Sequence, residues 1–178
     1  MLIFLSEPML HHCDLALLLG PFASNYDADL NSEDIHDQDL ALDKVKARGG
    51  TMIMWHTSLS AYITVIPTES PSFQTILLKM PGTVPSFHTS IYLPTAGKDD
   101  LFFSTLAELS SHFEEIKSNY PEAPLFIRGD ANINPNNLKR FKIFSHFCSS
   151  LHLSRIPLHH PTYHHFVGDG NFDSEIDV

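Results

Sequence analysis

Short apolar runs separated by Gly, Pro and polar residues predict a chain built mainly of strands, with two longer helical patterns. The runs typical of strands are rich in β-branched and aromatic residues. They cover residues 1–6, 51–56, 61–67, 73–80, 86–94 and 125–130. The opening run, MLIFLS, is mostly apolar and suits a buried strand. Residues 13–19, CDLALLL, fit either a short helix or a second strand.

Apolar residues at spacings of three and four predict two helices later in the chain. The first covers residues 99–119, has Asp99 and Asp100 in its first turn and stops before Pro121. Its apolar stripe consists of Phe102, Leu106, Leu109, Phe113 and Ile116. The second begins near Asn136 or Asn137, and its apolar face consists of Leu138, Phe141, Phe144, Cys148 and Leu151. Residues 162–178 predict a hairpin that turns at 168–170.

Four strands follow one another between residues 51 and 94, so the order is not the strict alternation of a doubly wound sheet. We therefore predict an α/β fold in which two mixed sheets pack together, with helices outside. A length of 178 residues suits one domain covering residues 1–178. Residues 25–48 are rich in acidic residues as far as Asp43 and poor in large apolar side chains, and they predict a mobile loop within that domain.

The formal net charge of -10 is concentrated near the N-terminus. Residues 1–43 contain nine acidic residues and no Lys or Arg, whereas the remaining 135 contain 12 acids and 11 bases. A phosphate-bearing substrate is therefore neither required nor excluded. Cys13 and Cys148 are interpreted as two free thiols rather than a disulfide. No run is typical of a signal peptide or a membrane span, which favours an intracellular protein of the nucleus or cytoplasm.

The stretch LFIRGDANINP places a carboxylate and a carboxamide two residues apart where an apolar strand ends. Side chains two apart on an extended chain point the same way, so Asp130 and Asn132 would enter one cleft. Asp130 can hold a metal or activate water, and Asn132 can donate and accept hydrogen bonds without charge. This division suits attack on a phosphodiester. The same spacing is also common in turns, where both residues cap backbone groups.

Three further polar residues lie at or near the ends of predicted strands. They are Glu7, Tyr92 and Asp177. Together with Gly129-Asp130-x-Asn132, the stretches around them resemble the endonuclease/exonuclease/phosphatase superfamily of DNase I-like enzymes. The segments FLSEPML, RGGTMIMW, IYLPTAGK, HPTYHHF and SEIDV are most similar to the endonuclease domains of non-LTR retrotransposons, and the resemblance covers nearly the whole chain.

This resemblance implies a four-layer α/β/β/α sandwich and Mg²⁺- or Mn²⁺-dependent hydrolysis of DNA phosphodiesters. It implies that Glu7 binds the metal together with Asp130, and that Asp130 positions or deprotonates the attacking water. Asn132 would orient that group and the phosphate, and Tyr92 would hydrogen-bond a phosphate oxygen. Asp177 would fix the tautomer of a catalytic histidine.

Two departures from the family pattern accompany the resemblance. Family members have an asparagine-bearing strand before the glutamate strand, whereas this chain starts with the glutamate strand. They also have a Ser-Asp-His element after the strand of Asp177, and no residue here matches its histidine. We therefore expect a fold that is incomplete at both ends and little or no nuclease activity from these 178 residues.

Three other motifs have simpler interpretations. Arg128-Gly129-Asp130 matches a cell-adhesion signal, but it closes an apolar strand rather than a loop tip. His159, His160, His164 and His165 could suggest zinc, although alternation would separate the last two. The stretch from Asp169 imitates a calcium loop but lacks its sixth-position glycine. Alternative hypotheses are a phosphatase of the same superfamily and a non-catalytic interaction domain that retains the fold.

Overall fold

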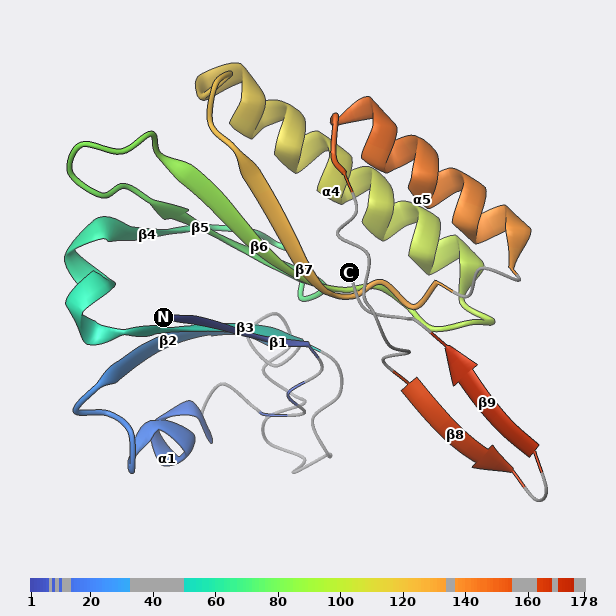
Figure 1. Ribbon diagram of the computed structural model, residues 1–178, viewed down its shortest axis with the longest axis horizontal. Helices are drawn as coiled ribbons and strands as arrows, with labels where there is room; N and C mark the ends of the chain where they lie inside the picture. The colour runs from blue at the N-terminus through green and yellow to red at the C-terminus, as the bar shows by residue number, and fades with distance from the viewer. Residues whose placement is uncertain are drawn as a thin grey trace.

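Two β-sheets packed face to face form the centre of the molecule in the computed structural model (Figure 1). The structure describes residues 1–6, 8, 10, 14–32, 50–133 and 137–154, and the backbone of residues 163–167 and 170–174. The first sheet has the order β1-β3-β2 and is antiparallel; it contains β1 (Leu2–Ser6), β2 (Tyr26–Asn31) and β3 (Thr51–His56). The second has the order β4-β5-β6-β7; it contains β4 (Ile63–Ile66), β5 (Phe73–Leu78), β6 (Ser86–Tyr92) and β7 (Leu125–Asp130).

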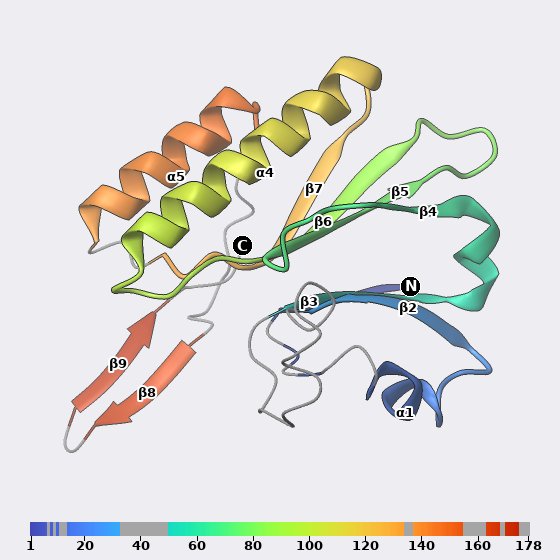
Figure 2. The ribbon, with the colours of Figure 1, turned by 180° about the vertical axis from the view of Figure 1, so that it is seen from behind.

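Helices cover the outer faces of both sheets, which produces the expected four-layer α/β/β/α order. The helices α4 (Asp99–Asn119) and α5 (Leu138–Ser150) cover the second sheet, and the short helix α1 (Leu15–Leu19) lies against the first (Figure 1). Figure 2 shows the same layers from behind. The 3₁₀ helix η2 (Thr57–Tyr62) leads from β3 into β4 and so joins the two sheets.

Three apolar clusters hold these layers together. The largest lies between the second sheet and the helices α4 and α5, and it contains the whole stripe predicted for residues 99–119. A second, built on Ile53, Trp55 and Ile76, lies between the sheets. A third, built on Leu30, Met52 and Met54, fills the space under α1. Strand β3 is therefore buried on both faces, as its unbroken apolar run TMIMW predicts.

The connection from β6 through α4 to β7 decides where the strand ends lie. Strands β4, β5 and β6 are antiparallel neighbours, but β6 and β7 are parallel. Parallel neighbours need a crossover, which α4 supplies. The C-terminal ends of β6 and β7 therefore lie next to each other. This end of the sheet, called the C-terminal edge below, carries the predicted site residues Tyr92 and Asp130.

The predicted loop over residues 25–48 is wrong for residues 26–31, which form β2. The sequence YDADLN alternates, and Tyr26, Ala28 and Leu30 pack toward α1. Asp27 and Asp29 take the other face, where they accept hydrogen bonds from Ser60 and Gln74. Acidic side chains can thus lie in this strand because polar groups on neighbouring segments donate hydrogen bonds to their carboxylates. Residues 33–49 lie outside the described part of the chain.

The remaining elements are close to their predicted positions. Residues 13–19 resolve to the helix α1, and the run 61–67 begins inside η2 and supplies only the four residues of β4. The hairpin predicted near the C-terminus is formed by β8 (Tyr163–Val167) and β9 (Gly170–Ser174). Among the described helices, none combines the length and the apolar character that crossing a bilayer requires.

Candidate active site

Tyr92 and Asp130 lie side by side at the C-terminal edge of the second sheet. They are the last residues of β6 and β7 and are register partners in the parallel ladder. The next amide, Leu93 N–H, donates to the Asp130 carbonyl over 2.9 Å and prolongs the ladder by one bond. Residues paired in a sheet share a face, so the tyrosine and the carboxylate point to the same side.

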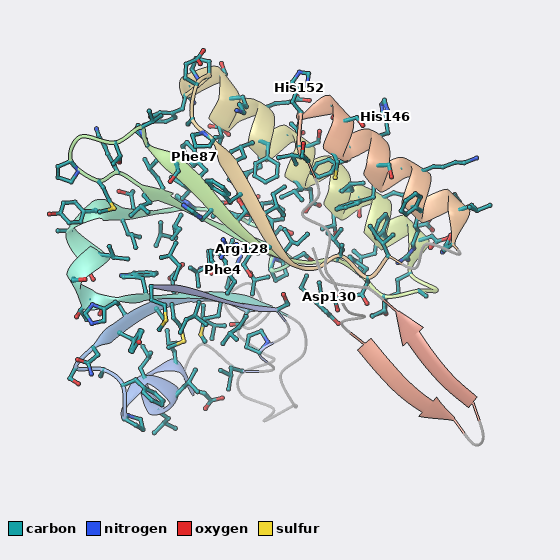
Figure 3. All side chains as sticks on the ribbon, viewed as in Figure 1. Phe4, Phe87, Arg128, Asp130, His146 and His152 are labelled. Atoms are coloured by element: carbon teal, nitrogen blue, oxygen red, sulfur yellow. The ribbon has the colours of Figure 1, made fainter. Side chains whose placement is uncertain are left out.

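That side is the one facing the first sheet. Arg128 lies two residues before Asp130 on β7, and its guanidinium lies 5.0 Å from the centre of the Phe4 ring on β1. Side chains two apart on a strand share a face, so Asp130 also points toward the layer that contains β1. Figure 3 shows Phe4 and Arg128 between the two sheets and Asp130 at the end of β7.

Asn132 is locked against Asp130 by a turn. Its backbone N–H donates to Asp130 Oδ1 over 2.8 Å, and its side-chain Nδ2 donates to the Leu93 carbonyl over 2.7 Å. Its φ of 49° is left-handed, a conformation that asparagine tolerates better than most residues. The Leu93 carbonyl accepts one of the two hydrogens of this amide nitrogen, and the amide oxygen is an acceptor that could bind a cation.

The prediction that alternation along an extended chain brings Asp130 and Asn132 together is therefore wrong, because β7 ends at Asp130 and a turn brings them together instead. This turn is compatible with the catalytic interpretation. The turn holds one carboxylate oxygen of Asp130 through a backbone N–H, while the strand end places that carboxylate beside Tyr92. The flanking residues Ala131 and Ile133 are buried in the cluster below the sheet and anchor the turn from behind. Both polar side chains are only partly buried, so a ligand can reach them.

Ser6, the last residue of β1, connects the first sheet to this edge. Its hydroxyl donates to the Ile91 carbonyl over 3.0 Å and accepts from the Asp130 N–H over 3.1 Å. Gly129 makes this approach possible, because a Cβ there would lie 2.1 Å from the Ile91 carbonyl oxygen and 2.7 Å from Ser6 Oγ. One hydroxyl thus holds the ends of β1, β6 and β7 together.

A buried arginine holds the loop that follows Tyr92. Arg140 on α5 is 1% exposed and donates to the backbone carbonyls of Pro94 and Thr95 over 2.7 and 2.9 Å. Its Nε donates to Asp99 Oδ1 over 2.8 Å, and its guanidinium lies 4.4 Å from the centre of the Phe102 ring. The loop between β6 and α4 is therefore tied to α5, which limits the movement of the segment beside the site.

His88 lies on the same face of the second sheet, next to Arg128. Its ring stacks on Phe126 with centroids 4.9 Å apart, and Phe4 lies 6.3 Å away on the other sheet. Burial, with a smaller contribution from the Arg128 charge, lowers the pKa of His88 to about 4. At neutral pH this histidine is therefore uncharged and contributes an aromatic ring, whereas Arg128 supplies the positive charge.

The structure brings together three of the five predicted site residues, which are Tyr92, Asp130 and Asn132. Glu7 and Asp177 lie outside the described residues, so their predicted roles stay predictions. No group of three or more His, Cys, Asp or Glu side chains placed to hold a metal occurs within the described part of the chain. The predicted Mg²⁺ or Mn²⁺ therefore depends on whether Glu7 joins Asp130.

Sequence reasoning missed Ser6 and Arg140. A serine at a strand end has no distinctive pattern, and only the packing of the sheets shows its two partners. Arg140 did leave a signal, because it precedes Phe144 and Phe147 by four and seven residues on the buried face of α5. A charged residue at such a position predicts a buried, fully hydrogen-bonded group.

Comparison with solved structures identifies this architecture. No protein-family model and no curated protein sequence matches the chain. The human Nocturnin catalytic domain superposes with a TM-score of 0.56 at 15% identity, over 84% of this chain and 56% of that one. The endonuclease domain of TRAS1, a telomere-specific non-LTR retrotransposon, gives 0.58 at 12% identity, over 93% and 76%. ANGEL2, a 2',3'-cyclic phosphatase, gives 0.54 at 13% identity, over 80% and 42%.

The chain has the DNase I-like fold. These structures share the architecture of the endonuclease/exonuclease/phosphatase superfamily, which confirms the fold that the sequence motifs implied. The chain spans about half the length of Nocturnin and ANGEL2 and about three quarters of the TRAS1 domain. At such low identity, the DNase I-like fold alone is established, and activity has to be argued from the site.

Proposed function

We propose that the edge formed by β6 and β7 is the active site of a divalent-metal-dependent phosphodiester hydrolase acting on DNA, of the retrotransposon endonuclease type. The observation that supports this proposal most strongly is the arrangement of Tyr92, Asp130 and Asn132. A carboxylate, a carboxamide and a phenol from two parallel strands meet at one partly exposed edge, held by backbone hydrogen bonds. These are an ionised group, a neutral group and a hydroxyl donor, as attack on a phosphodiester requires.

The described donors fit a hard divalent cation. Asp130 supplies a carboxylate, and Asn132 supplies an amide oxygen. The hydrogen bond from Asn132 Nδ2 to the Leu93 carbonyl fixes the orientation of that amide. Glu7 follows Ser6 in the chain, and Ser6 is hydrogen-bonded to the Asp130 N–H. We propose that Glu7 and Asp130 hold Mg²⁺ or Mn²⁺, which keeps several waters when bound through one or two carboxylates. Such an ion would neutralise developing charge on the phosphate.

The protein groups then have separate tasks. Asp130 orients the attacking water and accepts its proton, and the turn that holds Oδ1 keeps the carboxylate in one orientation. Asn132 orients that carboxylate through its backbone N–H, and its side-chain amide donates to a phosphate oxygen. Tyr92 donates its phenolic hydrogen to a phosphate oxygen that gains charge. Asp177 is assigned to hold a histidine in one tautomer, and this assignment rests on the family resemblance alone.

The resemblance to ANGEL2, a 2',3'-cyclic phosphatase, supports a second candidate function. A phosphatase of the same superfamily would use the same edge for a small phosphoester. A non-catalytic interaction domain would keep the fold and bind no metal through Asp130. The substrate range and the metal dependence distinguish these alternatives.

A nicking assay tests the proposal. The 178-residue chain is incubated with supercoiled plasmid and Mn²⁺ or Mg²⁺, and Asp130→Ala and Asn132→Ala are compared with Glu114→Ala, which removes an exposed carboxylate from α4. Any turnover should fall about 100-fold or more in the two site variants, because removing one group that stabilises the transition state lowers the rate by about 10²–10³. The control variant should keep the turnover of the wild type. The expectation of low overall turnover is tested by the same measurement.

Metal binding provides a readout that does not depend on turnover. Saturating Mn²⁺ should raise the unfolding temperature of the wild-type chain, since a ligand that binds only the native state stabilises it by about 2.7 kcal/mol at 100 times Kd. Asp130→Ala should lose this shift. If Mn²⁺ raises the unfolding temperature of the wild type and of Asp130→Ala equally, Asp130 is not a metal ligand. That result would favour the hypothesis of a non-catalytic interaction domain. Hydrolysis of a small phosphoester without plasmid nicking would favour the phosphatase.

A further inference from the structure

The side chains of β7 that face the first sheet form a row that leads to the candidate site, and those of Phe126 and Arg128 are exposed to solvent. Phe126, Arg128 and Asp130 occupy alternate positions and therefore share one face of the strand. Neighbours in this row are about 6.6 Å apart, twice the rise per residue of a strand. The row combines an aromatic ring, a guanidinium and the carboxylate assigned to catalysis.

Phe126 is more exposed than an apolar strand residue normally is. Its side chain is 42% exposed, although one side of its ring is stacked on His88 at an interplanar angle of 12°. His88 is itself held by a contact between its Nε2 and Ser86 Oγ of 3.0 Å. The phenylalanine thus has a ring that is stacked on one neighbour and partly exposed to solvent, as a stacking platform requires.

Arg128 is exposed and lacks an ion-pair partner among the described residues. Its guanidinium packs over Phe4 at 5.0 Å, which orients the group without neutralising it. Residues 44–178, which include the candidate site, contain 12 acids and 11 bases, so Arg128 lies in a part of the chain with almost no net charge. A guanidinium with no ion-pair partner among the described residues, next to a partly exposed aromatic ring, matches a ligand with a phosphate beside a planar base.

We propose that this face of β7 binds single-stranded nucleic acid, with one base stacked on Phe126, a phosphate on Arg128 and the strand continuing toward Asp130. The proposal rests on the proposed function, because it gives that site a substrate track. The strand is single because a base inside a duplex cannot offer its face to a side chain. The spacing of the row is comparable with the reach of one extended nucleotide, so ring and cation can contact neighbouring groups of one strand.

Oligonucleotide binding without divalent metal tests this inference separately from catalysis. Fluorescence anisotropy of a short labelled oligothymidylate is followed in EDTA with the 178-residue chain. Phe126→Leu keeps an apolar side chain but removes the ring, and it should weaken binding about ten-fold. Phe126→Tyr keeps the ring and should bind as the wild type does. Arg128→Gln should weaken binding and lower the slope of log K against log salt by about 0.7, which corresponds to one lost phosphate contact.

Two control substitutions match these changes elsewhere on the surface. Phe22→Leu alters an aromatic residue that is 52% exposed after α1. Lys139→Gln removes an exposed cation that packs 4.7 Å from the Phe103 ring on the helical side. Both should leave oligonucleotide affinity and salt slope unchanged. Thermal unfolding of every variant shows that the compared proteins are folded.

Several results would overturn the inference. These are absence of binding by the wild type, equal affinity of wild type, Phe126→Leu and Arg128→Gln, or an equal loss in the control variants. Light scattering that shows dimers which exclude the oligonucleotide would assign the face to a second copy of the chain. If nicking requires Asp130 while Phe126 and Arg128 do not affect binding, this inference fails and the proposed function stands. If oligonucleotide binding depends on both residues but neither Mn²⁺ binding nor hydrolysis depends on Asp130, the proposed function fails and this face still binds the strand.

Discussion

Single backbone positions determine whether the candidate site can form. Gly129 has a φ of 133°, and its missing Cβ lets the end of β7 approach the Ile91 carbonyl and the Ser6 hydroxyl. Asn132 turns the chain back with a φ of 49° and uses both of its amide nitrogens to hold the turn. The Gly-Asp-x-Asn motif is therefore required for packing as well as for chemistry. Gly129 before Asp130 allows the close approach of the strands, and Asn132 after it allows the left-handed turn.

Gly129→Ala should destabilise the protein by roughly 2–4 kcal/mol, through backbone strain and a clash with the Ile91 carbonyl. Urea unfolding at neutral pH measures the loss. Gly82→Ala and Gly97→Ala are matched controls, since both glycines have positive φ but no atom within 4 Å of an added Cβ. They should cost about 1 kcal/mol each. Equal losses at all three positions would show that φ alone, and not the close approach, matters at residue 129.

His88 should make stability depend on pH. Its folded pKa is lowered to about 4 from 6.5, so the unfolded chain binds this proton first as pH falls. Its contribution is therefore fully favourable above about pH 6.5 and is lost progressively toward about pH 4. His88→Phe keeps the stack with Phe126 but cannot titrate. Urea unfolding near pH 7 and about pH 5 should show a smaller loss for the variant than for the wild type.

The comparison between the two proteins isolates His88 from other titrating groups. Burial also lowers the pKa of His112, partly opposed by the Glu115 charge, and its ring is within 3.0 Å of the Thr75 hydroxyl on the helical side of the sheet. Both proteins share that contribution, as they share the carboxylates. A variant that loses stability as steeply as the wild type would show that His88 is not protected from protonation.

At the scale of elements, α5 contributes an arginine that organises a loop on another layer. Arg140 donates to two carbonyls of the loop after β6 and to Asp99 in the first turn of α4. The loop leaves β6 directly after Tyr92, and Leu93 is hydrogen-bonded to both Asp130 and Asn132. The helical layer therefore supports the site from behind, through contacts that do not reach its exposed edge.

Arg140→Met should destabilise the chain by about 3–5 kcal/mol, the cost typical of removing one partner from a buried charged network. The methionine stem can keep the contact with Phe102, but the carbonyls of Pro94 and Thr95 lose their donors. Lys142→Met on the exposed side of α5 should change the free energy of unfolding by less than about 0.5 kcal/mol. Both changes are measured by urea unfolding. A small effect at Arg140 would mean that water replaces its hydrogen bonds.

At the scale of the whole molecule, the two sheets depend on each other. Ser6 and Phe4 of β1 contact β6 and β7, and Asn31 of β2 donates to the carbonyls of Ser70 and Phe73 over 2.6 and 3.0 Å. Between these polar contacts lies the cluster built on Ile53, Trp55 and Ile76. Because hydrogen bonds and apolar packing both cross the interface, neither sheet can lose its structure without exposing the other.

The chain should therefore unfold as one cooperative unit. Trp55 is the sole tryptophan of the sequence, is 8% exposed between the sheets and donates to Ser60 Oγ over 3.1 Å. Its fluorescence reports the interface, while circular dichroism reports the strands and helices together. The two signals should give the same urea midpoint. Separate midpoints would show that the sheets fold independently and would contradict the prediction of one domain.

The sequence alone determined most of the elements and the architecture. Spacings of three and four predicted α4 over residues 99–119, which are the bounds that the structure has, because burial of one helix face requires this period. Short apolar runs predicted the strands, and the resemblance of the motifs predicted four layers. The prediction failed at β2, where acidity concealed the alternation of Tyr26, Ala28 and Leu30. Asp27 and Asp29 fit this strand because Ser60 of η2 and Gln74 of the other sheet donate hydrogen bonds to them.

Only the tertiary structure decided how the site is assembled. A sequence shows that Asp130 and Asn132 end a strand, but it does not show that β6 is the parallel neighbour that brings Tyr92 beside them. It shows neither that Ser6 of the first sheet holds the Asp130 amide nor that Arg128 stays without a carboxylate among the described residues. Local periodicity follows from each segment's own need to bury a face, whereas pairing, register and hydrogen bonds between sheets depend on residues far apart in the chain.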